Sequence, residues 1–164
     1  MNGRTVLTVP RFIGLALLAG AMLAGPAGAK DTAVWFSYVD KEAAAVGFAT
    51  PESDDVRFVL YCEHASRKVS VTVKRTLTGV KEKQPLAIDL SAGASKVSLN
   101  GVAVADKDDG YIYGEARDVS VAPVVDVLRA SGPLKVKLAG KSFSFPEKGR
   151  ANHLKVFENG CKAK

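Results

Sequence analysis

The stretch VRFVLYCEHASRKVSVTVK, residues 56–74, decides the fold class, because its apolar and polar side chains alternate along most of its length. In an extended chain, alternate residues point to opposite faces. The first half places one apolar set on a single face, namely Val56, Phe58, Leu60 and Cys62. The second half repeats the pattern from Lys68 to Lys74, and Ala65-Ser66-Arg67 suits a hairpin connection. The stretch therefore predicts two antiparallel strands, with Cys62 facing the interior.

Seven further runs are predicted to be strands, at residues 33–39, 44–49, 86–90, 97–105, 111–119, 134–138 and 142–145. Nine short strands separated by Gly, Pro, Asp and Ser predict a mainly β protein, an antiparallel β-sandwich or barrel. Two segments have helical spacing instead. The segment 121–131 would bury one face through Val124, Val125, Val127 and Leu128. The segment from residue 150 to about residue 160 would bury Ala151, Leu154 and Phe157, with Cys161 next on the same face.

The first 29 residues are interpreted as a signal peptide. Arg4 and Arg11 precede an uncharged run over residues 12–29, and a basic start followed by an apolar stretch is typical of an export signal. The run ends in Ala27-Gly28-Ala29, whose small side chains suit signal peptidase, so we expect cleavage after Ala29. Its glycines and Pro26 make it a poor permanent helix. We expect no stable membrane span after cleavage.

Cleavage would leave residues 30–164, a length that suits a single β-rich domain with its own core. No internal repeat and no linker-like stretch divides them. Loss of the two leader arginines lowers the formal net charge from +6 to +4. A mildly basic protein favours anionic neighbours, such as an acidic envelope protein or an anionic polymer. The lysines between residues 68 and 83 alternate with valines and threonines as on a solvated strand face, so nucleic acid is not an expected partner.

Cys62 and Cys161 are the only cysteines. In an exported protein an even cysteine count predicts a mutual disulfide. A bridge that closes about 100 residues stabilises a fold by about 4.7 kcal/mol on the chain-entropy model. Leader and disulfide together predict a periplasmic or secreted protein whose terminal helix is fixed to the strand ending at Cys62.

The sequence contains none of the strong motifs of catalysis or cofactor binding. A Gly-x-Ser-x-Gly elbow, a His-Glu-x-x-His pair, a Walker loop and a Gly-x-Gly-x-x-Gly turn are all missing. His64 and His153 are the only imidazoles, and the fold could bring them together. Two ligands without a third make a weak metal site. We therefore expect no enzymatic activity, no catalytic residue, no metal and no cofactor.

Two acidic stretches are predicted to be solvated loops. Residues 106–110 resemble part of a calcium loop, but Gly110 falls one place early and Arg117 occupies the closing position, which requires an acidic residue. Residues 51–55 form the second acidic loop.

Aromatic residues supply the candidate binding site. Trp35, Phe36 and Tyr38 open the domain, and Tyr111 and Tyr113 share one face of a predicted strand. The tyrosine pair forms either a core layer with its hydroxyl groups at the rim, the arrangement we expect first, or an exposed patch for partner binding.

The order of leader, early Trp35, acidic loop, Cys62 strand and terminal helix resembles that of small periplasmic proteins of proteobacteria. The tail LKVKLAGKSFSFPEKGRANHLKVFENGC, residues 134–161, resembles the ending of the invasion-associated locus B family. That resemblance implies an exported accessory or host-interaction role.

A second resemblance is to periplasmic lysozyme inhibitors of the membrane-bound C-type class, through Leu60-Tyr61-Cys62 and the late cysteine. The nearest match to that family's Ser-Gly-x-x-Tyr loop is residues 109–113, which lack the serine, so no inhibitory residue is carried over. A net charge of +4 also suits a basic lysozyme poorly. The sequence therefore predicts an exported binding or accessory protein without catalytic activity, with inhibition of a cell-wall hydrolase as the alternative.

Overall fold

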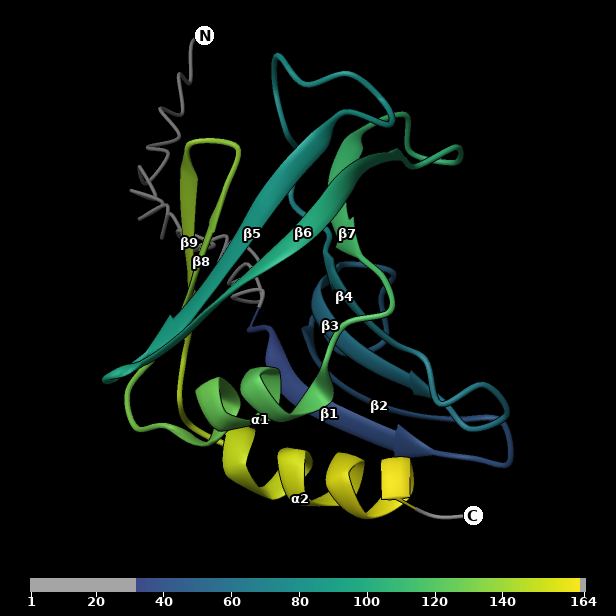
Figure 1. Cartoon of the computed structure of the whole chain (residues 1–164), viewed down its shortest axis with the longest axis vertical. Coiled ribbons are helices and arrows are strands. Elements are labelled where there is room, and N and C mark those ends of the chain that lie inside the picture. The colour runs from purple at the N-terminus through teal and green to yellow at the C-terminus, as the bar shows by residue number, and fades with distance from the viewer. Residues whose placement is uncertain (1–31, 163–164) are drawn as a thin grey trace, which may run out of the picture. The chain divides into compact units, whose positions relative to one another are not determined.

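The computed structural model describes residues 32–162. The predicted signal peptide, residues 1–29, and its cleavage site lie outside this part of the chain. The described elements are, in chain order (Figure 1), β1 (Val34–Val39), β2 (Ala43–Ala49), β3 (Val56–Glu63), β4 (Val69–Val73), β5 (Pro85–Ala92), β6 (Ser95–Ala105), β7 (Ile112–Ala116), α1 (Val121–Arg129), β8 (Leu134–Leu138), β9 (Lys141–Phe145) and α2 (Arg150–Lys162).

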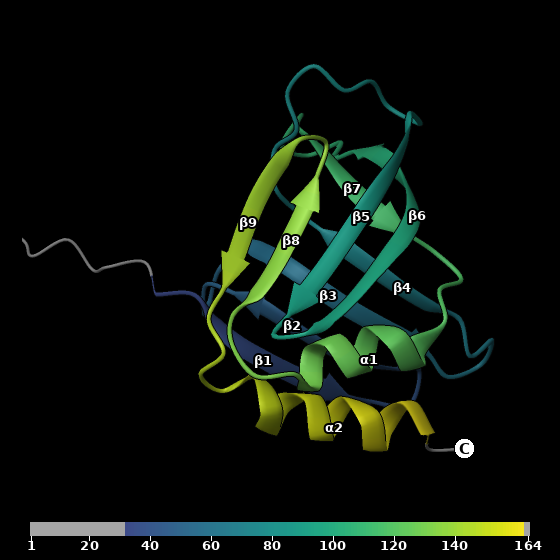
Figure 2. The same cartoon turned by 60° about the vertical axis from the view of Figure 1, so that its left-hand side comes forward.

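All nine strands belong to one antiparallel sheet, in the order β1-β2-β3-β4-β7-β6-β5-β8-β9. The predicted mainly β, antiparallel class is confirmed. The sheet curls into a half-barrel (Figure 2), so that Phe145 near one edge reaches Phe48 and Phe58 near the other, with ring centroids 5.4 and 5.9 Å apart. The structure thus resembles an open barrel more than two stacked sheets, and β1 and β9 are its edges.

The strand alternation in residues 56–74 sets the two faces of the sheet. β3 and β4 pair with Leu60 opposite Val71, and Cys62 opposite Val69. These four side chains are buried on the inner face. The predicted hairpin and the inward direction of Cys62 are confirmed, because a one-residue change in register would turn the apolar set to solvent.

The helices close one end of the half-barrel (Figure 2). α1 packs on β5 and β6, and α2 packs on β1 and β2. The predicted buried face of α1 is confirmed by four residues, Val124, Val125, Val127 and Leu128. Neither helix within residues 32–162 is long and apolar enough to cross a membrane.

The buried side of α2 differs from the prediction at one position. Leu154 and Phe157 are buried as expected, but Ala151 is exposed and the preceding Arg150 is buried in its place. The reason is helical spacing, because Arg150 lies four and seven residues before Leu154 and Phe157 on the same face, whereas Ala151 is turned about 100° away. A Cβ atom on Gly160 would come within 2.5 Å of Val39, so the contact line runs through Gly160, Phe157 and Arg150.

The strand before α1 is shorter than predicted. β7 covers residues 112–116, whereas the sequence pattern extended to 119. Asp118 has a left-handed backbone with φ of 52°, which no strand accommodates, and the chain turns there into α1. α1 itself ends at Arg129, two residues before the predicted end.

Candidate functional site

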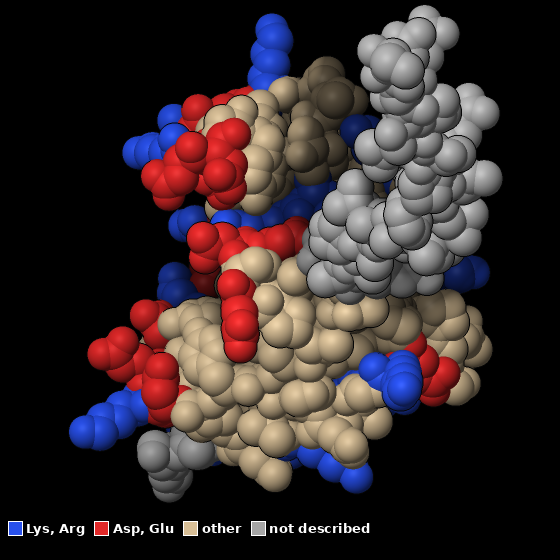
Figure 3. All heavy atoms as spheres, turned by 180° about the vertical axis from the view of Figure 1, so that it is seen from behind, with Lys and Arg blue, Asp and Glu red and all other residues tan. Residues whose placement is uncertain are grey.

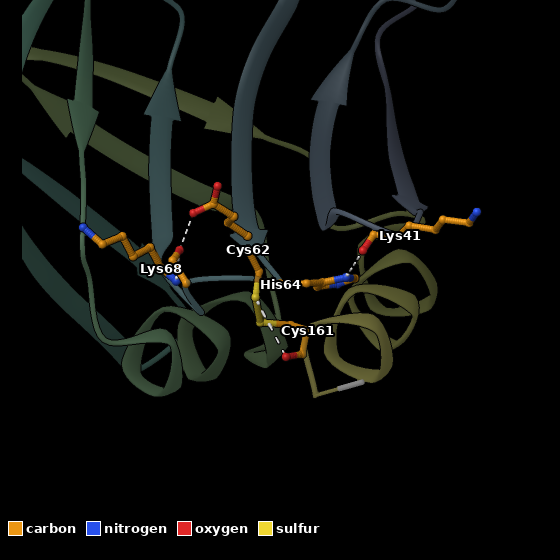
Figure 4. Close-up of a disulfide and its surroundings, with 7 residues drawn as sticks. Lys41, Cys62, His64, Lys68 and Cys161 are labelled. Carbon is orange, nitrogen blue, oxygen red and sulfur yellow. Dashed lines mark hydrogen bonds between the residues drawn. A yellow bond between two sulfur atoms is a disulfide. The ribbon is translucent and has the colours of Figure 1, made fainter. Parts of the chain in front are cut away.

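The predicted disulfide between Cys62 and Cys161 is present, with Cα atoms 5.7 Å apart. It joins the end of β3 to the last turn of α2 (Figure 4). Cys62 is 1% exposed and Cys161 is half-buried, so the bridge lies at the edge of the core. It therefore fixes the terminal helix across the inner face of the sheet, as predicted.

The two histidines have separate partners. His64 lies beside the disulfide (Figure 4), with Nδ1 3.4 Å from the Lys41 carbonyl oxygen. His153 lies on α2 eight residues before Cys161, about 12 Å along the helix axis. Within residues 32–162 no group of three or more His, Cys, Asp or Glu side chains is arranged to hold a metal ion.

His153 forms a hydrogen bond with a serine. Its Nδ1 lies 2.9 Å from the Ser37 hydroxyl oxygen, which β1 directs toward α2. A serine nucleophile also needs a third group that orients the histidine ring. In the described part of the chain, no carboxylate is hydrogen-bonded to the other ring nitrogen of His153. Within the described residues, Ser37 and His153 thus supply the serine and the histidine of such a site but not the carboxylate that would orient the ring.

Tyr111 and Tyr113 are half-buried on the outer face of the sheet, and neither belongs to the core. The core layer that we expected first is therefore wrong for both residues, because Gly114 and Ala116 take the inward positions of β7. The two rings lie 6.2 Å apart, and burial raises the pKa of both hydroxyl groups. Their role in partner binding stays a prediction.

Lys74 and Asp106 complete the surroundings of the tyrosine pair. The Lys74 ammonium lies 5.5 Å from the Tyr113 ring centre and 3.2 Å from an Asp106 carboxylate oxygen. Burial acts to lower the pKa of Lys74, but the bond to Asp106 helps to raise it above its ordinary value. Backbone amides, Asp109 first, and the Lys74 ammonium lower the pKa of Asp106. The predicted turn at residues 106–110 is confirmed, since the Asp106 side chain accepts bonds from the Asp108 and Asp109 amides.

Tyr111 also lines a hollow that we call the charged cleft. The cleft has a volume of about 570 Å³ and lies where the β2–β3 loop, the end of β4, the β6–β7 loop and the start of β9 meet. Figure 3 shows a hollow at mid-height with basic and acidic side chains on its walls. Its lining residues are Asp54, Asp55, Val56, Lys74, Arg75, Thr76, Asp109, Tyr111, Lys141 and Phe143.

The cleft holds three basic and three acidic side chains, and two of these six already have salt-bridge partners. Lys74 pairs with Asp106, and Asp55 pairs with Arg57. Within the described residues, the other four form no salt bridge, namely Arg75, Lys141, Asp54 and Asp109. Unpaired charges of both signs therefore face one concave surface.

A second feature of the outer face is an apolar area that we call the aromatic platform, formed by Phe36, Tyr38 and Tyr61 with Val34 and Val59. The register places Phe36 over Gly47, where an added Cβ atom would meet the Phe36 ring at 2.6 Å. Tyr38 and Tyr61 flank Ala45, which is fully buried. In Figure 3 the lower part of this side, over β1–β4, carries few charged side chains.

Most cleft residues were not singled out from the sequence. The sequence pattern places Lys74 on a solvated strand face and Phe143 in a predicted strand, and it gives Arg75 and Lys141 no role in binding. These residues come together only because β4 pairs with β7 and because the sheet curls β9 toward β3. The one available signal was the position of Lys74 and Arg75 directly after a strand, where side chains gather at the end of a sheet.

Comparison of the chain with protein-family models, with curated proteins and with solved structures finds no match in any of the three. The resemblances to the invasion-associated locus B family and to C-type lysozyme inhibitors stay predictions.

Proposed function

We propose that this protein is an exported binding module without catalytic activity, which contacts another envelope protein or an envelope polymer through the outer face of its sheet. Export is supported by the leader-like first 29 residues and by the disulfide, which persists in oxidising compartments. The disulfide also fixes α2 to β3, and a rigid scaffold presents its outer face to a partner with little loss of conformational freedom.

The aromatic platform carries this proposal. Val34 and Tyr38 keep 47% and 43% of their surface exposed, although both lie on a regular strand where polar residues would serve solubility better. Contiguous exposed apolar surface on a soluble domain marks an interaction site more often than chance exposure does. Tyrosine is favoured at such sites because a large rigid ring gives contact area at low entropic cost.

Affinity capture tests the proposal. The disulfide-bonded protein is immobilised and exposed to an envelope extract of the source organism, and binding of each identified partner is then measured again with purified components. The Tyr38→Ser/Tyr61→Ser variant is expected to lose binding at least about tenfold, as for residues central to an interface. Val156→Ser on α2 is the matched control, since Val156 is 45% exposed outside the platform. Equal binding by the double variant and the wild type would contradict the proposal.

The same preparation tests the absence of catalysis and the inhibitor alternative. Replacing Ser37, His64 and His153 together is expected to leave partner binding intact, because none belongs to the platform. Substrate turnover by the wild type that this triple variant loses would show an enzyme instead. Loss of lysozyme activity on addition of the protein would favour the inhibitor.

A further inference from the structure

We propose that the charged cleft is a second binding site, which takes a small zwitterionic ligand of the chemical class of a short peptide with both termini free. The cleft lies on strand ends and loops at the mouth of the half-barrel, which is a common location of ligand sites in curled sheets. Its volume of about 570 Å³ falls in the usual range for small-molecule sites. The proposal does not depend on the aromatic platform.

One wall of the cleft is suited to a carboxylate. The Arg75 guanidinium lies 5.5 Å from the centre of the Phe143 ring, which holds the group in place by a cation–π contact. The Lys141 ammonium donates a hydrogen bond to the carbonyl of Thr76, the residue after Arg75. The two cations therefore lie on the same wall, and each keeps donors for an anionic group.

Two loops that line the same cleft carry carboxylates suited to an ammonium group. Asp54 comes from the β2–β3 loop and Asp109 from the β6–β7 loop, and within residues 32–162 neither carboxylate has a salt-bridge partner. Asp109 is close enough to Tyr111 to affect the pKa of its hydroxyl group. The Tyr111 and Phe143 rings supply apolar surface in the same cleft.

The balance of charge decides among ligand classes. A purely anionic ligand would gain from Arg75 and Lys141 but would be repelled by the two free carboxylates. A purely cationic ligand would gain from Asp54 and Asp109 but would be repelled by Arg75 and Lys141. A ligand with one group of each sign can contact both kinds of charge, and it leaves the existing Lys74–Asp106 and Arg57–Asp55 pairs undisturbed.

Nuclear magnetic resonance titration of the isotope-labelled, disulfide-bonded protein tests the proposal. The probes are trialanine, its C-terminal amide, its N-acetyl form and the doubly blocked peptide. Trialanine is expected to shift amide signals around Arg75, Asp109 and Lys141, with a Kd on the order of 1 mM. Blocking either terminus is expected to weaken binding about two- to fivefold, the range typical of exposed ion pairs.

Two charge-removing variants make the assignment specific. Arg75→Gln is expected to weaken the binding of trialanine but not that of its C-terminal amide. Asp109→Asn is expected to weaken the binding of trialanine but not that of its N-acetyl form. Lys155→Gln, at an exposed α2 position, is the control. Unchanged signal dispersion shows that each variant is folded. Equal binding of the doubly blocked peptide, or no shift near the cleft with trialanine at about ten times the expected Kd, would overturn the proposal.

Discussion

The two ends of the half-barrel differ in chemistry. At one end α1, α2 and the disulfide cover the sheet, and buried apolar residues such as Leu154 and Phe157 fill the space between them. At the other end the strands open into loops, and charged side chains line a cleft of about 570 Å³. The closed end has the buried contacts that stabilise a fold, whereas the open end has exposed groups that are free to bind.

This difference indicates that the groups that stabilise the fold are separate from the groups that we propose to bind at the open end. Removing buried groups at the closed end exposes apolar surface or leaves polar atoms unpaired, and both effects are costly. Exposed charges at the open end add little to stability because water solvates them equally well in the unfolded chain. Substitutions at the closed end should therefore lower the free energy of unfolding. Substitutions at the open end should weaken ligand binding with little effect on the free energy of unfolding.

The largest effect is expected from loss of the disulfide. Cys62→Ala/Cys161→Ala should lower the free energy of unfolding by about 4–5 kcal/mol, because the unfolded chain regains the freedom of a loop of about 100 residues. Urea denaturation of the variant and of the oxidised wild type measures the difference, and chemical reduction of the wild type is the control. A loss below about 1 kcal/mol would place the main stabilising contacts elsewhere.

A smaller effect is expected from Arg150, whose side chain is 2% exposed. It donates hydrogen bonds to the Ala130 and Gly132 carbonyl oxygens and lies over the Trp35 ring. Arg150→Ala should cost about 2–4 kcal/mol, since both carbonyl groups lose a charged donor. Arg129→Ala is the matched control on α1, because Arg129 is exposed and should cost less than about 1 kcal/mol. Thermal denaturation of both variants measures the two losses of stability. Similar losses would contradict the prediction that the buried arginine stabilises the fold more than the exposed one.

The smallest effect is expected from the Lys74–Asp106 pair at the open end. The pKa of Asp106 is lowered in the fold, so its contribution is present above its unfolded pKa and is lost as pH falls through the folded value. The pKa of Lys74 is raised, so its contribution is lost only as pH rises through that higher value. Asp106→Asn should therefore lower the neutral plateau slightly and flatten the fall in stability below about pH 4, because the variant lacks the ionised carboxylate at every pH. An unchanged acid limb in pH-dependent urea titrations would contradict this prediction.

Local pattern was sufficient to predict most elements of the fold. The alternation around Phe58 and Val71 fixed the faces of β3 and β4, and the position of Cys62 on the inner face made its bridge to Cys161 sterically reasonable. The local sequence pattern does not decide between a sandwich and a barrel. That choice depends on the pairing of β4 with β7 and of β5 with β8, contacts between residues far apart in the sequence.

The candidate sites show the same limit. Tyr111 and Tyr113 were recognised by type, but the sequence did not show which face of the sheet they would share with Lys74. Arg150 was overlooked because charged residues are seldom buried. Its position follows from helical spacing, since Arg150 lies four residues before Leu154 and seven before Phe157, on the same face of α2.

Hydrogen–deuterium exchange of the disulfide-bonded protein at neutral pH compares the two ends in a single experiment. Amides of β2, β3 and α2 are expected to exchange most slowly and to do so together, whereas the loops at residues 50–55, 74–84 and 106–110 exchange first. Early exchange of α2, or cleft loops as protected as β3, would show that stability does not reside at the closed end.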